Sequence, residues 1–159
     1  MGKFSAALGL WVWVWGAAAS AACAPDTVEL RTLAGNVIRF SAELAATEAE
    51  RELGLMNRDK MASSAGMLFA YPEPHHVYFW MKNTLIPLDM VFANAEGRVT
   101  AVHSDAVPLD ETPIDGGDGV RYVLEINGGL ARKLGLVPGT VLRSAMLDQS
   151  ASVWPCSGE

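Results

Sequence analysis

The stretch of sequence that decides the fold is FWMKNTLIPLDMVF, residues 79–92. Apolar and polar residues alternate on both sides of residues 84–87, a pattern typical of two strands joined by a turn. Because side chains alternate between the faces of a sheet, a hairpin with this turn places Lys82 opposite Asp89, with Trp80 on the same face. The other face is apolar and is expected to meet the core through Phe79, Met81, Met90 and Phe92.

Similar strand patterns occur on both sides of this segment. They predict strands over residues 27–33, 37–40, 66–71, 77–83, 88–93, 98–103, 120–126 and 140–147. The acidic, glycine-rich residues 104–119 are expected to form a surface loop, with a lid or a weak cation site as the alternatives. Many short strands with little helix predict a mainly β fold: a single β-sandwich or a distorted barrel-like domain with two short helices.

Both predicted helices carry terminal signals. Thr47 and Glu50 form a capping box at the start of the first helix, and Gly54 provides its end. Asn127 is the expected N-cap of the second helix, which Gly135 ends.

The composition indicates one acidic domain. The chain has 159 residues, 18 acidic and 12 basic side chains, and a formal net charge of −6. Proteins that bind nucleic acid neutralise phosphates with clustered Lys and Arg, and this chain has no such cluster. A nucleic-acid partner is therefore not expected.

The first 22 residues have the layout of a signal peptide. A positive charge at Lys3 precedes an apolar run over residues 6–19, and small residues follow it. This run is too short for a typical transmembrane helix, although an uncleaved membrane anchor is an alternative. We expect a signal peptide over residues 1–22, a single β-rich domain over 23–147 and a polar tail over 148–159. The protein is then periplasmic or secreted, with no transmembrane segment after signal cleavage.

Two cysteines stand near the ends of the chain that remains after cleavage. Cys23 and Cys156 are expected to form a disulfide in an oxidising compartment. Alternatively, residues 20–23 resemble a lipobox, and Cys23 then carries a lipid anchor that makes the protein a membrane-anchored lipoprotein. Free thiols are the third possibility.

Four segments resemble a known family. They are RELGLMNR (51–58), GMLF (66–69), FWMKNTLIPLDMVF (79–92) and VLEIN (123–127). With these motifs the chain resembles the exported bacterial and archaeal proteins called domain of unknown function 192, over about residues 27–147. The resemblance implies a single β-rich, sandwich-like domain with small helices behind a signal peptide. It implies no activity.

The sequence offers few groups for catalysis. His75, His76 and His103 lack the spacing of a zinc site, so no metal and no cofactor are expected. Lys82 and Asp89 are the only acid/base candidates, and their pair can equally be a salt bridge or a ligand anchor. The other motif charges, Arg51 and Arg58, suit carboxylate or phosphate groups. Either arginine can instead pair with the nearby acids Glu48, Glu52 and Asp59.

Three functions remain open from the sequence. The first is an envelope module that binds a small molecule or glycan over Trp80, with polar contacts from Lys82, Asn83, Thr84, Asp89 and Arg58. The second is a small periplasmic hydrolase or lyase that uses the Asp89/Lys82 pair. The third is a structural or interaction domain in which the motif fixes an unusual hairpin.

Overall fold

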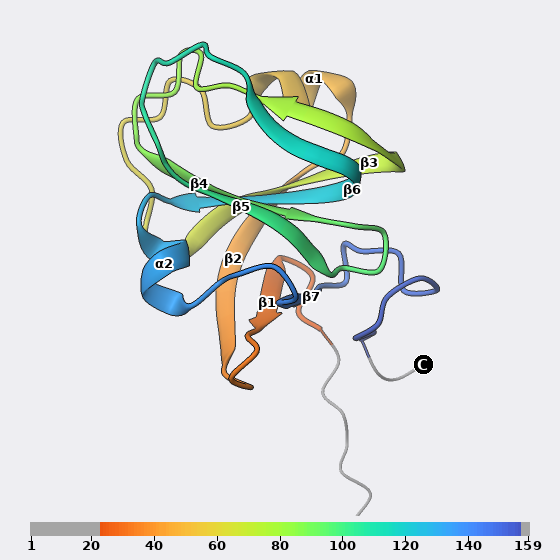
Figure 1. Cartoon of the computed structure of the whole chain (residues 1–159). Helices are drawn as coiled ribbons and strands as arrows, with labels where there is room; N and C mark the ends of the chain where they lie inside the picture. The colour runs from red at the N-terminus through yellow and green to blue at the C-terminus, as the bar shows by residue number, and fades with distance from the viewer. Residues whose placement is uncertain (1–22, 157–159) are drawn as a thin grey trace, which may run out of the picture.

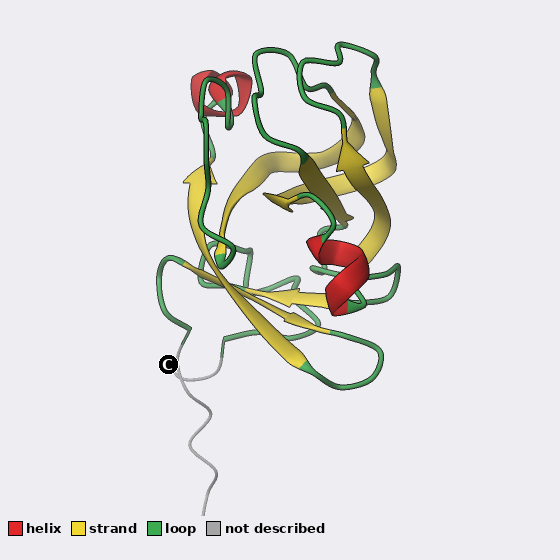
Figure 2. Cartoon of the chain, turned by 90° about the vertical axis from the view of Figure 1, so that its left-hand side faces the viewer, coloured by secondary structure: helices red, strands yellow, loops and turns green. Residues whose placement is uncertain are grey.

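The structure, a computed structural model, describes residues 23–156 as one curled sheet with two short helices. The predicted signal peptide lies outside the described residues. The strands are β1 (Thr27–Arg31), β2 (Val37–Ala45), β3 (Ala65–Phe79), β4 (Leu88–Ala93), β5 (Val99–Ala106), β6 (Ile114–Asn127) and β7 (Val141–Arg143). They pair in the order β5-β4-β6-β3-β2-β1-β7, and only β2 and β3 run parallel. The prediction of a mainly β, barrel-like domain with two short helices is confirmed, and the sheet forms a half-barrel (Figure 2).

The curl comes from the two longest strands. In Figure 1, β3 and β6 both bend, so that their paired ends fold back above the rest of the sheet. The register of this pair shifts between Ala70 and His75, and again on either side of Val77. Such bulges bend a strand and strengthen its twist. Pro72 and Pro74 lie inside the first shift, where the missing N–H of a proline breaks no regular ladder bond. The prediction of two strands, 66–71 and 77–83, is therefore wrong.

The predicted hairpin over residues 79–92 is also wrong. Strand β3 ends at Phe79, residues 80–87 form a loop, and β4 pairs with β5 and β6 instead of β3. The reason is that β6 lies between the two expected partners and forms hydrogen bonds with both. All six residues of β4 are buried, as expected for a central strand rather than a hairpin arm. Lys82 and Asp89 are consequently not cross-strand neighbours.

Two predictions for the C-terminal half, the loop over residues 104–119 and the strand over 140–147, have the wrong bounds. The loop expected over residues 104–119 is shorter, because β5 continues to Ala106 and β6 begins at Ile114. The start of β6 pairs with the end of β3, a long-range contact that local composition does not indicate. The last strand is confined to β7, since residues 144–147 turn away from β1.

Both faces of the sheet are covered by apolar clusters. Leu124 and Ile126 of β6 contribute to one cluster, together with residues of β1 and β7. Val123, on the opposite face, joins a second cluster that includes Met67, Phe69 and Phe92. Glu125 lies on this second face, directly after Val123 in the alternation of β6.

The helices differ in how their first turns are capped. Helix α1 (Glu48–Leu53) has the predicted capping box between Thr47 and Glu50, and it ends at Gly54 with a positive φ of 49°. Helix α2 (Leu130–Leu134) ends at Gly135 as predicted, but Asn127 does not cap it. The Asn127 amide donates instead to the carbonyl groups of Met61 and Ala62, and the acceptor at the start of α2 comes from β4.

The ends of the described chain are joined. Cys23 and Cys156 form the predicted disulfide, with their Cα atoms 5.5 Å apart. The tail also packs through Trp154, whose ring lies 4.4 Å from the guanidinium carbons of both Arg31 and Arg143. Within residues 23–156 there is no helix of the length and hydropathy needed to span a membrane.

Candidate functional site

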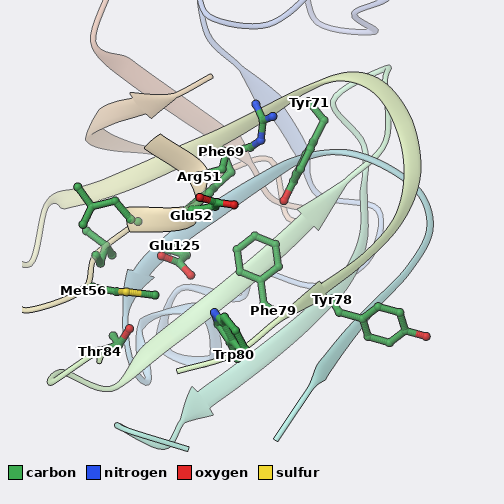
Figure 3. Close-up of a pocket in the computed structure, with 13 residues that line it drawn as sticks. Arg51, Glu52, Met56, Phe69, Tyr71, Tyr78, Phe79, Trp80, Thr84 and Glu125 are labelled. Atoms are coloured by element: carbon green, nitrogen blue, oxygen red, sulfur yellow. The ribbon is translucent and has the colours of Figure 1, made fainter. Parts of the chain in front are cut away.

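A cleft lies between α1, the bend of β3 and the loop that follows β3. It has an open outer groove of about 680 Å³ and a smaller inner pocket of about 90 Å³. The groove and the pocket share six lining residues: Arg51, Glu52, Met56, Tyr71, Tyr78 and Trp80. Figure 3 shows the inner pocket, with Arg51, Phe69 and Tyr71 on one side and Phe79 and Trp80 across from them.

The bend of β3 builds the apolar wall of the inner pocket. It brings Phe69, from before the bend, against Phe79 at the end of the strand, with ring centroids 5.2 Å apart and nearly perpendicular planes. Phe79 also packs edge-on against Phe92 of β4 at 5.8 Å. Edge-to-face packing of this kind fixes the ring orientations. The end of α1 lies close to this wall, because a Cβ added at Gly54 would be 3.2 Å from the Phe69 ring.

Aromatic surface is exposed at the mouth of the cleft. Trp80 is 49% exposed and Tyr78 is 63% exposed. The ammonium nitrogen of Lys82 lies 5.0 Å from the centroid of the Trp80 ring, within cation–π range. The structure therefore brings together Trp80 and Lys82, two of the residues predicted to bind a ligand.

The loop that carries Trp80 and Lys82 is fastened at several points. The main-chain N–H of Met81 donates to Asp110 O at 2.8 Å, and Asn57 N donates to Asn83 O at the same distance. Asn83 adopts a positive φ of 53°, and its side-chain amide lies against the sulfur of Met56. Thr84 is buried at the edge of the inner pocket, and its hydroxyl donates to Lys82 O at 3.2 Å. The motif residues thus hold the loop as well as line the cleft.

Arg51 forms part of the cleft wall through contacts other than the expected ion pairs. Its Nη1 donates to Ala70 O at 3.0 Å and also to Ala46 O. Its guanidinium carbon lies 4.8 Å from the centroid of the Tyr71 ring. Within residues 23–156, Arg51 forms no salt bridge, so its predicted pairing with a nearby acid is wrong.

Arg58 lies outside the cleft lining. It pairs with Glu43 of β2 through both guanidinium nitrogens, with an Nη2–Oε2 distance of 2.7 Å. The hydrogen bonds from Arg58 hold the pKa of the Glu43 carboxyl below its ordinary value. The arginine is thus paired with an acid, as expected, but with a strand residue distant in sequence rather than Glu48, Glu52 or Asp59.

Asp89 is buried on the sheet face opposite the cleft. It is 0% exposed, and its carboxylate accepts three backbone N–H groups, from Asp105 at 2.7 Å, Gly129 at 2.9 Å and Ala131 at 2.6 Å. Two of these groups belong to the start of α2. Asp89 therefore caps α2 from β4 and is not part of the arrangement around Trp80, contrary to the sequence-based expectation.

Glu125 is the residue of the cleft that sequence reasoning missed. It is 4% exposed, and its carboxyl group lies in the inner pocket between Met56 and Phe79 (Figure 3). Among residues 23–156 it forms no side-chain hydrogen bond or salt bridge. Burial raises the pKa of Glu125 to about 8. The signal was present in the sequence: Glu125 is the single acid in the otherwise apolar run VLEI, residues 123–126.

The chemistry available in the cleft is that of aromatic faces, hydrogen bonds and charges. Within residues 23–156, no three His, Cys, Asp or Glu side chains lie close enough to hold a metal ion. The ionisable groups of the cleft are Glu48, Arg51, Glu52, Tyr71, His75, Tyr78, Lys82 and Glu125.

Comparisons with known proteins agree with the fold. The model of the family DUF192, described as "Uncharacterized ACR, COG1430", matches residues 30–144. A crystal structure from Sinorhizobium meliloti 1021, described as a "putative transcription regulator", is 43% identical, with a TM-score of 0.72, covering 77% of this chain and 95% of its own. A protein of unknown function from Novosphingobium aromaticivorans DSM 12444 is 42% identical, with a TM-score of 0.70, covering 73% of this chain and 82% of its own. No curated protein matches the chain.

Proposed function

The chain belongs to the DUF192 family, and we propose that it is a non-enzymatic module that binds a small molecule or glycan in the cleft over Trp80. The observation that carries this proposal is the exposed aromatic surface at the mouth of a preformed cleft, where Trp80 is 49% exposed and Tyr78 is 63% exposed. Neighbouring exposed aromatic side chains at a cleft form an apolar surface of the kind that marks ligand-binding grooves.

A sugar ring suits this surface in both shape and polarity. The C–H groups of a pyranose can cover an aromatic face, while its hydroxyl groups reach outward to charged side chains. The outer groove offers such partners in Lys82, Glu48 and Glu52. Its volume of about 680 Å³ lies within the range of known small-molecule sites.

The roles of the motif residues follow from their positions. Trp80 and Lys82 are the proposed contacts, and Asn83 and Thr84 position the loop that carries them. Arg58 and Asp89 are not included, because the first is paired with Glu43 and the second caps α2. Catalysis by an Asp89/Lys82 pair is not proposed, since the pair does not form.

Export of the protein is part of this proposal. We propose that residues 1–22 act as a signal peptide and that the module works in the periplasm or outside the cell. The Cys23–Cys156 disulfide supports an oxidising compartment, because such bonds are rare in the cytosol. A sulfur in this disulfide is not free to carry a lipid, so the lipid anchor at Cys23 and the disulfide are alternatives.

The test is calorimetric titration of the purified chain with four β-linked disaccharides: cellobiose, lactose, xylobiose and N,N′-diacetylchitobiose. We expect binding of at least one sugar, and loss of that binding in Trp80→Ala with an unchanged melting temperature. Trp154→Phe is the matched control, because Trp154 packs on the opposite end of the sheet against Arg31 and Arg143. Binding that survives in Trp80→Ala, or no binding by any of the four sugars, contradicts a glycan site at Trp80. If Trp80→Ala loses sugar binding because it is unfolded, as a large fall in melting temperature would show, the result favours the third function, a structural motif.

A further inference from the structure

The inner pocket differs from the groove in front of it. Its volume is about 90 Å³, which leaves room for a group of only a few non-hydrogen atoms. The lining is largely apolar, with Leu55, Phe69 and Phe79 contributing side chains. The carboxyl group of Glu125 lies among them (Figure 3). The pocket therefore suits a small group that is apolar at one end and polar at the other.

The unpartnered state of Glu125 points to a ligand. The side chain is 4% exposed, and within residues 23–156 it has no hydrogen-bond partner. Within residues 23–156 no fully buried side-chain oxygen or nitrogen lacks a hydrogen-bond partner, so the Glu125 carboxyl group reaches solvent through the pocket. A carboxyl group that faces a pocket and has no protein partner is available to a ligand. A molecule that pairs with Glu125 there replaces its contact with water.

At neutral pH this carboxyl group is a donor as well as an acceptor. Burial raises the pKa of Glu125 to about 8, so that the group keeps its proton. A neutral carboxylic acid presents one O–H donor and one carbonyl acceptor side by side. The ligand group that pairs with the O–H must therefore offer an acceptor.

Other ionisable groups face the pocket from the elements around it. Arg51 and Glu52 come from α1 and Tyr71 comes from β3, whereas the Tyr78 ring points away from Glu125 and lies 4.7 Å from the His76 ring (Figure 3). Burial raises the pKa of the Tyr71 hydroxyl above its ordinary value, so that it stays protonated up to pH 9. Glu48, His75 and Lys82 border the outer groove only. A test that uses pH must separate Glu125 from all of these groups.

We propose that the inner pocket binds the acetamido group of an N-acetylated sugar, whose carbonyl accepts a hydrogen bond from Glu125. The methyl group then contacts Leu55, Phe69 and Phe79, and the sugar ring lies over Trp80 in the outer groove. This inference rests on the proposed glycan-binding function, and it names the class of glycan.

Two other small groups fit the pocket less well. A ligand carboxylate brings a charge into an apolar cavity, where desolvation is costly. A single hydroxyl group leaves the apolar wall without contact. An acetamido group accepts a hydrogen bond through its carbonyl and places its methyl group against the wall.

The test compares two disaccharides that differ at the 2-position. Calorimetry on the full chain with its disulfide intact, at pH 6.5, measures binding of N,N′-diacetylchitobiose and of cellobiose. We expect about tenfold tighter binding of the acetylated sugar, the value of about one neutral hydrogen bond. Glu125→Leu should remove this preference, and Glu125→Gln should keep it, because the glutamine amide also donates a hydrogen bond. Neither variant removes a contact that the fold uses, and melting temperatures check this.

A second arm varies the pH from 7 to 9. The affinity of the natural protein for diacetylchitobiose should fall about tenfold, as Glu125 loses its proton, and that of Glu125→Gln should stay constant. A fall of equal size in Glu125→Gln assigns the effect to another group and overturns the proposal.

The outcomes separate this inference from the proposed function. Equal, Trp80-dependent binding of the two sugars contradicts the acetamido pocket and leaves the binding module intact. A preference that survives in Glu125→Leu also overturns the inference, since another group then recognises the acetamido group. Absence of binding by both sugars contradicts the inference and the glycan function together.

Discussion

Asp89 and Glu125 are buried acids on neighbouring central strands, and their surroundings are opposite. Asp89 pairs in register with Ile126, and Glu125 pairs with Met90, so that the two carboxyl groups lie on opposite faces of the sheet. Asp89 accepts three backbone N–H groups, whereas Glu125 has no partner within residues 23–156 and lines a pocket. Burial alone therefore does not indicate the role of an acid. The hydrogen-bond partners of the carboxyl group indicate its role. The Asp89 carboxyl stabilises the fold, and the Glu125 carboxyl is available to a ligand.

Exchanging each acid for the corresponding amide should give the largest difference between the two sites. Asp89→Asn should reduce the free energy of unfolding by about 3–5 kcal/mol, because an amide replaces a charged acceptor of three N–H groups. Glu125→Gln at pH 7 should leave it unchanged or raise it, since no native contact is lost. Urea denaturation of both variants measures the difference. Equal destabilisation by the two substitutions would show that the two carboxyl groups do not differ in structural role.

The pH dependence of stability sharpens the comparison further. The folded chain keeps the proton of Glu125 up to about pH 8, whereas the unfolded chain releases it near the ordinary value of 4.5. The unfolded chain therefore binds fewer protons between these values, and stability falls as the pH rises. We expect Glu125→Gln to remove a loss of up to about 1.4 kcal/mol per pH unit between pH 5 and 8. Parallel stability curves for the natural protein and the variant would rule out a raised Glu125 pKa.

Several local features of the fold could be predicted from the sequence. The capping box at Thr47 and the glycines that end both helices are local signals, and the structure contains them. Strand pairing is not local, so the insertion of β6 between β3 and β4 could not be read from residues 79–92. The apolar composition of LDMVFA, residues 88–93, was a sign of a doubly buried strand that would have moved Asp89 away from the surface.

The candidate site was predicted only in part, for the same reason. Trp80 and Lys82 are two residues apart, and their proximity follows from local geometry. The inner pocket instead depends on the bend of β3 and on the approach of α1 to Phe69, which join segments far apart in the chain. A solitary acid in an apolar strand, as at Glu125, is a sequence signal of such a site.

Trp80→Ala should weaken sugar binding and have little effect on stability. The side chain is half exposed, so its removal should change the free energy of unfolding by about 1 kcal/mol or less. Its loss from a binding surface should weaken sugar affinity by about 2 kcal/mol, since aromatic anchors dominate such contacts. Thermal denaturation measures the change in stability, and calorimetry on the same preparation measures the change in sugar affinity. A large stability loss with unchanged affinity would place Trp80 with Asp89 among the residues that hold the fold.

Arg58→Ala should have the smallest effect. The Arg58–Glu43 pair lies at the surface, where ion pairs contribute about 0–1 kcal/mol. Sugar affinity should not change, because Arg58 is not among the residues that line the cleft. A tenfold loss of affinity in this variant would mean that the binding surface extends beyond the cleft to β2.

The most direct test of the central claim is to titrate the Glu125 carboxyl carbon by NMR, with and without N,N′-diacetylchitobiose. We expect the free protein to titrate at about pH 8, the value that burial gives this group, and the bound protein to titrate higher, because the ligand pairs with the protonated form. The Glu125→Gln spectrum identifies the signal by its absence. Titration near the ordinary value of 4.5 that is unmoved by the sugar would contradict the claim that Glu125 is a buried, unpartnered acid available to a ligand.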